Sequence, residues 1–110
     1  MFRTQYRYWV YILTNKPKGV LYIGVTGDIN ERMQRHYFGK GSKFTSKYSI
    51  KRLVYFEEFQ FIEEAIKREK QLKNWHRQWK INLIENKNPK WQNLWTSGNS
   101  ENVDPETSSG

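Results

Sequence analysis

The chain has 110 residues, a length that suits one domain with one modest core. Aromatic residues make up 16% of it, which argues against a disordered chain and favours a fold built around large rings. Lys and Arg outnumber Asp and Glu by 19 to 11 and no apolar run approaches the roughly 18 residues of a spanning helix, so a nucleic acid is a better expected partner than a membrane.

The N-terminal stretch, MFRTQYRYWVYIL, is aromatic and is interrupted by Arg3 and Arg7, unlike a signal peptide. The chain contains no cysteine, so neither a disulfide framework nor a thiolate zinc site is expected. Together these features predict a cytoplasmic protein with no membrane attachment.

Two strands, residues 6–14 and 20–26, are predicted around a Lys-Pro-Lys-Gly turn, because both segments are rich in aromatic and β-branched residues. A tight turn would place Tyr11 directly opposite Tyr22, with the aliphatic side chains of both strands on the other face. The two phenols and the neighbouring Gly24 would then form a polar notch on an otherwise apolar sheet. The alternative interpretation is ordinary cross-strand aromatic packing.

A helix is predicted to follow Asp28, a suitable N-cap, and to end near Gly39. At about 100° per residue, its inward stripe comprises Ile29, Met33 and Tyr37. Arg32 and His36 fall inside or beside this stripe rather than opposite it. Taken singly, Arg32 could extend its charge to solvent and His36 could be a satisfied core histidine.

The next segment, residues 39–51, has the glycine and serine content of a loop and contains four lysines. RLVYFEEF, residues 52–59, is predicted to be a third strand. The basic residues expected to contact a nucleic-acid backbone are Lys40, Lys43, Lys47, Lys51 and Arg52. The alternative is that the segment is merely a solvated loop.

Residues 61–87 read as helical throughout, with a break near residues 75–77. The apolar face before the break comprises Ile62, Ala65, Ile66 and Leu72. Glu69 lies in the middle of that face, where an unpartnered carboxylate costs several kcal/mol. Pairing with Lys73 one turn later is one explanation. A polar site that Glu69 shares with the tyrosines, Arg32 and His36 accounts for all of them at once.

The C-terminal part divides in two. NPKWQNLW, residues 88–95, is predicted to form a turn that packs its aromatic rings onto the body. Residues 96–110 are polar and acidic with no apolar periodicity, which predicts a disordered tail after a domain formed by residues 1–95.

These residue types suit one kind of chemistry. A guanidinium binds phosphate through paired hydrogen bonds, and a tyrosine or histidine can take a proton from water. One carboxylate is a poor metal cage but an adequate anchor for Mg²⁺, which keeps most of its waters. Hydrolysis of a phosphodiester with one hydrated metal ion fits this set. The absence of a P-loop and of a second carboxylate beside Glu69 argues against an NTPase or a two-metal nuclease.

The stretch WVYILTNKPKGVLYIGVTGDINERMQRH resembles the opening of a GIY-YIG nuclease domain, and the resemblance continues through KFTSKY, LVYFEEF, EAIKREKQLKNW and NPKWQNLW. It is strongest to small stand-alone bacterial members related to the nuclease module of the excision-repair incision subunit. One departure is Trp9-Val10-Tyr11, where the glycine and isoleucine of the first motif are replaced. The resemblance implies an α+β fold, with a small three-stranded antiparallel sheet flanked by helices.

The resemblance also implies roles for individual residues. Tyr11 and Tyr22 match the tyrosines of the two motifs, and Arg32 matches the helix arginine that holds the scissile phosphate. His36 matches a histidine found one turn later in many members. Glu69 matches the single metal-binding glutamate, so Mg²⁺ (or Mn²⁺) is the expected cofactor.

The implied activity is metal-dependent endonucleolytic cleavage of nucleic acid, with DNA the expected substrate and DNA repair the expected setting. A water poised by Tyr11, with help from Tyr22 or His36, would attack the phosphorus while Arg32 neutralises the phosphate oxygens. The metal ion on Glu69 would stabilise the departing 3′ oxygen. Positive charge from Arg32 and the metal is expected to lower the pKa of Tyr11 from about 10.

Two further assignments and two rival functions complete the expectations. Lys73 is expected to extend the nucleic-acid surface. Asn93 resembles a late asparagine that closes the site in some branches of the family. The rival functions are a catalytically silent nucleic-acid-binding module and an interaction protein whose basic face docks an acidic partner.

Overall fold

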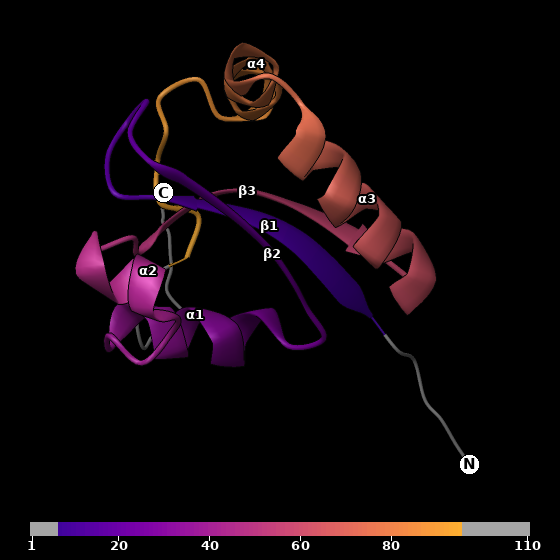
Figure 1. The fold of residues 1–110 in the computed structure, drawn as a ribbon, viewed down its shortest axis with the longest axis horizontal. Coiled ribbons are helices and arrows are strands. Elements are labelled where there is room, and N and C mark those ends of the chain that lie inside the picture. The colour runs from indigo at the N-terminus through magenta and orange to yellow at the C-terminus, as the bar shows by residue number, and fades with distance from the viewer. Residues whose placement is uncertain (1–6, 96–110) are drawn as a thin grey trace, which may run out of the picture.

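The computed structural model describes residues 7–95, which form a three-stranded antiparallel sheet between two layers of helices (Figure 1). The strands are β1 (Tyr8–Thr14), β2 (Leu21–Thr26) and β3 (Arg52–Phe59), in the spatial order β2-β1-β3. One layer contains α1 (Ile29–Tyr37) and α2 (Lys43–Lys47), and the other contains α3 (Ile62–Asn74) and α4 (Arg77–Lys87). The predicted α+β class is therefore confirmed. The predicted tail, 96–110, lies outside the described residues.

Each face of the sheet has its own core. The core under α3 and α4 includes Val10, Ile12, Ile23, Val54, Ala65, Leu72, Ile81 and Ile84. The core under α1 comprises Tyr11, Leu13, Met33, Ile50 and Leu53. Because successive side chains of a strand point to opposite faces, β1 contributes to both cores and is buried on both sides. None of the helices in the described part of the chain is both long and apolar enough to cross a membrane.

The predicted hairpin has the correct faces but the wrong register. Tyr11 pairs with Gly24, and Tyr22 pairs with Leu13, so the two tyrosines are diagonal neighbours rather than direct partners. The turn is two residues longer than predicted, because the Asn15 side chain accepts a hydrogen bond from Val20 N at 3.0 Å inside the loop. A shift of two residues leaves every side chain on its predicted face.

The layer that carries α1 differs from the prediction in two places. Asp28 is the N-cap of α1 as predicted, since its side chain accepts a hydrogen bond from Glu31 N. Tyr37, however, is 41% exposed and does not belong to the inward stripe. Residues 39–51 are not all loop, because they contain α2, whose N-cap Ser42 accepts a hydrogen bond from Thr45 N.

The long helical segment breaks at residues 75–76, as predicted, into α3 and α4. Ile66 is 38% exposed, so its predicted place on the buried face of α3 is wrong. Arg68 fixes α3 against β3, because its guanidinium donates two hydrogen bonds to Glu57, at 2.9 and 2.8 Å. Burial, the largest single effect, opposes ionisation of Glu57, but hydrogen bonds from Arg68 and Tyr55 and the charges of Arg68 and Lys87 together outweigh it and lower the pKa of that carboxyl. This ion pair holds the turn of α3 on which Glu69 lies.

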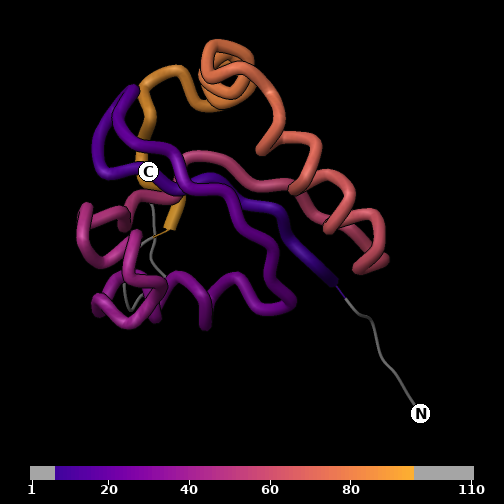
Figure 2. The backbone as a smooth tube through the Cα atoms, viewed as in Figure 1, coloured from indigo at the N-terminus to yellow at the C-terminus, as the bar shows by residue number. Residues whose placement is uncertain are grey.

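The segment after α4 passes along the edge of β3, from the α4 layer toward the α1 layer (Figure 2). Its Trp91 is buried in the first core, as the predicted packing of this segment requires, and Trp95 packs against the second. Leu94 N donates to Leu53 O at 2.7 Å, and Asn88 Nδ2 donates to Val54 O at 3.0 Å. These bonds satisfy β3 carbonyls that would otherwise face solvent.

Candidate active site

Tyr11 is fully buried in the central strand, and its ring lies across Gly24 of the edge strand β2. A Cβ atom at position 24 would stand 2.5 Å from the Tyr11 hydroxyl and 2.6 Å from the ring carbon that bears it. No real side chain fits in that space, so a glycine is required here. The phenol thereby lies directly over β2, an edge strand of the sheet.

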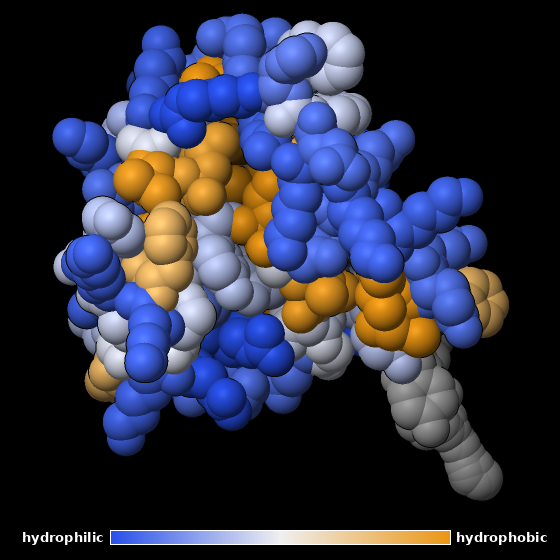
Figure 3. Space-filling view, viewed as in Figure 1, coloured by the Kyte–Doolittle hydropathy of each residue, from blue (hydrophilic) through white to orange (hydrophobic). Residues whose placement is uncertain are grey.

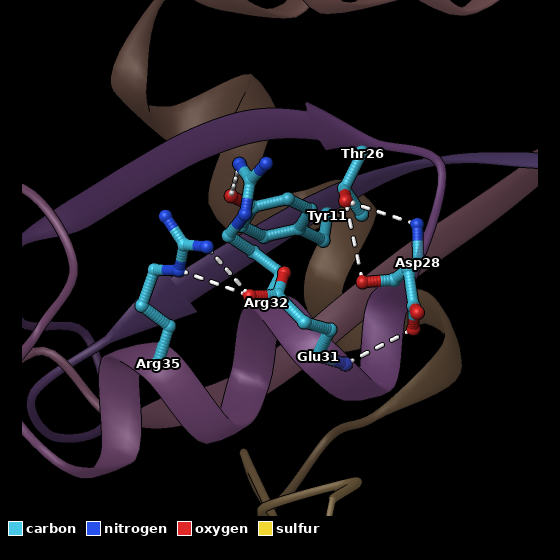
Figure 4. Close-up of polar contacts among 6 residues, drawn as sticks. All are labelled: Tyr11, Thr26, Asp28, Glu31, Arg32 and Arg35. Carbon is cyan, nitrogen blue, oxygen red and sulfur yellow. Dashed lines mark hydrogen bonds and ion pairs between the residues drawn. The ribbon is translucent and has the colours of Figure 1, made fainter.

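Arg32 extends from α1 toward this phenol (Figure 4). Its Nη1 donates to the Tyr11 hydroxyl at 3.4 Å, which is a long hydrogen bond. Its Nε is buried and has no partner within the described part of the chain. Arg35, three residues further along α1, instead donates hydrogen bonds to the exposed Glu31 (Figure 4). Arg32 therefore keeps donor capacity free beside the buried phenol.

His36 and Tyr22 complete the polar group on this face of the sheet. The His36 ring lies edge-on to both tyrosines, with centroid distances of 6.1 Å to Tyr11 and 5.6 Å to Tyr22. The two tyrosine rings are 6.4 Å apart. Burial lowers the pKa of His36, and the positive charges of Arg32 and Arg35 lower it further. His36 is consequently neutral at pH 7.

Glu69 belongs to α3, in the other helical layer, yet its charge acts on Tyr11 and helps to raise the pKa of that phenol. Its side chain is only 15% exposed, and its carboxylate forms an ion pair of 2.9 Å with Lys73. The alternative interpretation of Glu69, a pair one turn along the helix, thus describes a contact that exists. It does not account for the burial of the carboxylate, because the Lys73 partner is mostly exposed and such pairs stabilise a helix by only about 0.3–0.5 kcal/mol.

The pKa of Tyr11 is raised rather than lowered in the protein alone. Burial of the phenol is the largest cause, and it outweighs the hydrogen bond and positive charge of Arg32. Arg32 lowers this pKa as expected, but its contribution is smaller than that of burial, so the net shift in the free protein is upward. The Tyr11 hydroxyl is protonated at neutral pH and is a hydrogen-bond donor as well as an acceptor.

Exposed lysines and exposed aromatic rings alternate around α2. Lys40, Lys43, Lys47 and Lys51 are all exposed. Phe44 is 43% exposed and stacks on Tyr22, with 6.3 Å between the ring centroids. Its centroid lies 5.0 Å from that of Tyr48. In Figure 3, apolar side chains form a diagonal band along the sheet between the hydrophilic surfaces of the helices. The sequence interpretation identified the lysines but missed the aromatic rings among them.

Asn93 and Arg52 make structural contacts at the edge of β3. Asn93 Oδ1 accepts hydrogen bonds from Leu53 N and Trp95 N, each at 3.1 Å, and Arg52 donates to Trp91 O at 3.0 Å. Within residues 7–95, no hydrogen bond joins Asn93 to Tyr11, Arg32 or Glu69. The predicted role of Asn93 in closing the site stays a prediction, and its observed role is to hold the C-terminal segment.

Replacement of Gly24 by Ala is expected to displace the Tyr11 ring, because the new Cβ would overlap its hydroxyl. We expect a loss of stability of about 1–3 kcal/mol from overpacking and a disproportionate loss of any activity that needs the phenol. Chemical denaturation measures the first effect. Gly27→Ala is the matched control, since its Cβ would stand 3.7 Å from the Tyr8 ring, in ordinary contact. Equal behaviour of the two variants would contradict the requirement at position 24.

The chain is similar to known proteins in both sequence and fold. Residues 7–82 match the model of the GIY-YIG catalytic domain. UPF0213 proteins of Staphylococcus aureus, from strains Mu3 and COL, are each 38% identical to the chain over 78 residues, covering 71% of the chain and 94% of the relative. A UPF0213 protein from Bacillus halodurans, solved in solution by NMR, has 34% sequence identity and a TM-score of 0.51, covering 79% of this chain and 92% of that one.

Proposed function

The chain belongs to the GIY-YIG family, and on that premise we propose that it is an endonuclease that hydrolyses phosphodiester bonds in nucleic acid, with DNA as the substrate and a divalent metal ion as cofactor. The observation that carries the proposal is the meeting of Tyr11, Arg32 and His36 on one face of the sheet with the charge of Glu69 from the other layer. Removing any of these groups should affect cleavage more than folding.

Arg32 is the proposed phosphate-binding group. Its buried Nε has no partner within residues 7–95, and its Nη1 holds only a long contact with Tyr11. A guanidinium with free donors binds the non-bridging oxygens of a phosphodiester and neutralises the charge that develops on them.

Tyr11 and His36 are the proposed proton-handling groups. Because Tyr11 is protonated at neutral pH, it orients the attacking water and relays its proton, and does not start as a phenolate. His36 is neutral, so it has a ring nitrogen with a lone pair that can accept a proton. Tyr22 lies between His36 and Phe44 and orients the imidazole.

The donor set fits a hydrated divalent ion and no other kind of metal site. Among the described residues, no group of three or more His, Cys, Asp or Glu side chains could form a metal cage. The single carboxylate of Glu69 suits Mg²⁺ or Mn²⁺, which retain waters and bind substrate phosphate oxygens. Such an ion supplies stabilisation of negative charge on the departing oxygen when it is bound.

The surface around α2 is the proposed nucleic-acid contact. Lys40, Lys43 and Lys47 supply charge for a phosphate backbone, and Phe44 offers a ring face next to Tyr22. A positively charged surface with interleaved aromatic rings is typical of proteins that contact both backbone and bases. Lys51, just before β3, adds exposed positive charge after α2, and Lys73 is exposed on α3 in the other helical layer.

Replacement of Phe44 by Leu is expected to weaken nucleic-acid binding by about 1–3 kcal/mol, because the apolar bulk is kept while the stacking face is lost. The slope of binding against salt concentration should not change, since no charge is removed. Fluorescence anisotropy over a salt series measures both quantities. Phe61→Leu is the control, because Phe61 is also exposed (56%) but lies at the start of α3. Wild-type affinity in Phe44→Leu would remove Phe44 from the contact surface.

A cleavage panel tests the proposed function as a whole. Single-stranded, duplex, nicked and branched DNA, and RNA of the same shapes, are incubated with the full chain in Mg²⁺, in Mn²⁺ and in a chelator. We expect cleavage of at least one DNA substrate with either ion and none in the chelator. Salt-sensitive binding without cleavage under every condition would favour a catalytically silent binding module instead.

A further inference from the structure

The environment of His36 Nδ1 determines which ring nitrogen carries the proton. Nδ1 lies 3.1 Å from the hydroxyl oxygen of Thr45, and both side chains are buried. The Thr45 hydroxyl donates its single proton to the carbonyl oxygen of Ser42, at 3.1 Å. The same oxygen accepts a hydrogen bond from Ser42 Oγ at 3.2 Å. A hydroxyl has one proton and two lone pairs, so the remaining interaction requires His36 Nδ1 to be the donor.

The orientation of the Ser42 hydroxyl supports this assignment. Ser42 Oγ accepts a hydrogen bond from Thr45 N at 3.1 Å in its role as N-cap of α2. Its proton is then free to point at Thr45 Oγ1. Every donor in the network has an acceptor when Nδ1 carries the imidazole proton. The opposite tautomer would force Thr45 to abandon the Ser42 carbonyl.

The other ring nitrogen, Nε2, is buried and has no hydrogen-bond partner among residues 7–95. A buried acceptor without a partner is unfavourable, so its retention needs a reason. The ring that carries it lies edge-on to Tyr11 and Tyr22 in the candidate site. An unprotonated Nε2 at this place is available to receive a proton.

Gly41 supplies the room for the arrangement. A Cβ at this position would lie 2.4 Å from His36 Nδ1 and 2.8 Å from Thr45 Oγ1, and would separate the two groups. Gly41 does not have a positive φ angle, so the backbone conformation is open to other residues. Space for the hydrogen bond, rather than conformation, is what a glycine provides here.

We propose that Thr45 is a positioning residue that holds His36 in the Nδ1–H tautomer, so that Nε2 accepts the proton released when water attacks the phosphodiester. The role of this proton rests on the proposed function, whereas the tautomer does not. As the bond between the water oxygen and phosphorus forms, the proton that the water loses passes to Nε2. The bond to the 3′ oxygen breaks, the departing oxygen takes a proton from solvent, and the imidazolium later returns its proton to solvent.

Nitrogen NMR of the imidazole rings tests the tautomer without any substrate. His36 and His76 are the only histidines in the sequence, and His76 is exposed, so it serves as the internal reference and a His76→Gln spectrum assigns the signals. In the wild-type chain at about pH 8, His36 is expected to show a protonated Nδ1 and an unprotonated Nε2. A protonated Nε2 in the wild type would overturn the proposal, and this measurement needs no variant of the network to fold.

Two substitutions of Thr45 connect the tautomer to cleavage. Thr45→Val keeps the shape and removes the acceptor, so His36 should move toward the Nε2–H tautomer and cleavage should slow at least about tenfold. Thr45→Ser keeps the hydroxyl and should retain the wild-type tautomer and most of the rate. A Thr45→Val chain with the wild-type tautomer, or with the wild-type rate, would refute the positioning role. Absence of cleavage in the wild type would instead refute the proposed function and leave the tautomer result standing.

Discussion

Glu69→Gln is expected to yield a folded protein that binds nucleic acid but does not cleave it in Mg²⁺. The amide has the same shape as the carboxylate and can still form hydrogen bonds, but it lacks the charge that a divalent ion requires. Loss of metal stabilisation is worth several kcal/mol, or a rate reduction of about a thousandfold or more. Single-turnover cleavage at saturating enzyme measures this loss separately from binding.

The ion pair between Glu69 and Lys73 makes a second readout necessary for this variant. If the pair were the whole role of Glu69, the substitution would cost only about 0.3–0.5 kcal/mol of stability and would leave metal binding intact. Titration with Mn²⁺ followed by electron paramagnetic resonance should show reduced binding in Glu69→Gln. Glu64→Gln is the matched control, because Glu64 is an exposed carboxylate on the same helix. Unchanged Mn²⁺ affinity together with retained cleavage would remove the metal assignment.

Tyr11→Phe is expected to reduce the cleavage rate by about 10²–10⁴-fold, the range for loss of a positioned proton-transfer group. The ring stays in place over Gly24, so packing is preserved. The lost hydrogen bond from Arg32 is long, at 3.4 Å, so the free energy of unfolding should change by less than about 1 kcal/mol. Denaturant titration and single-turnover kinetics on the same preparation test both expectations.

Tyr8→Phe is the control for the Tyr11 substitution. Tyr8 is a half-buried tyrosine of the same strand that packs against the core on the other face of the sheet, away from His36 and Arg32. It should keep wild-type cleavage. If Tyr11→Phe cleaves within a few-fold of wild type, the phenol is an aromatic component of the core, and proton transfer depends on His36 or Tyr22.

The sequence predicts the faces of the sheet better than the contacts between them. A register shift of two residues keeps Tyr11 and Tyr22 on the same face of the sheet. The alternation of side chains along each strand was therefore enough to predict that they share a face. The register depends on how Asn15 folds into the turn, which is a property of one side chain in three dimensions. The short helix α2 was missed because its apolar content is low, although Ser42 three residues before Thr45 has the spacing of a helix N-cap.

The candidate site was predictable only in part for the same reason. Arg32 and His36 lie one turn apart on α1, so helical periodicity places them together. Glu69 acts on Tyr11 through its charge from the opposite layer, and no local pattern relates the two residues across the sheet. Asn93 stands in a matching motif, but its hydrogen bonds to Leu53 and Trp95 appear only when the chain returns to the edge of β3.

The return of the C-terminal segment to the edge of β3 affects how readily copies of the protein associate. An uncovered edge strand offers its amide and carbonyl groups to any other extended chain, and so invites sheet-to-sheet association between copies. The first half of β3 is shielded because Asn88 and Leu94 occupy the carbonyls of Val54 and Leu53. The second half carries Glu57 and Glu58, whose ion pairs with Arg68 and Arg7 place charged side chains on this strand. The protein therefore guards the β3 edge of its sheet with its own backbone and with charged side chains.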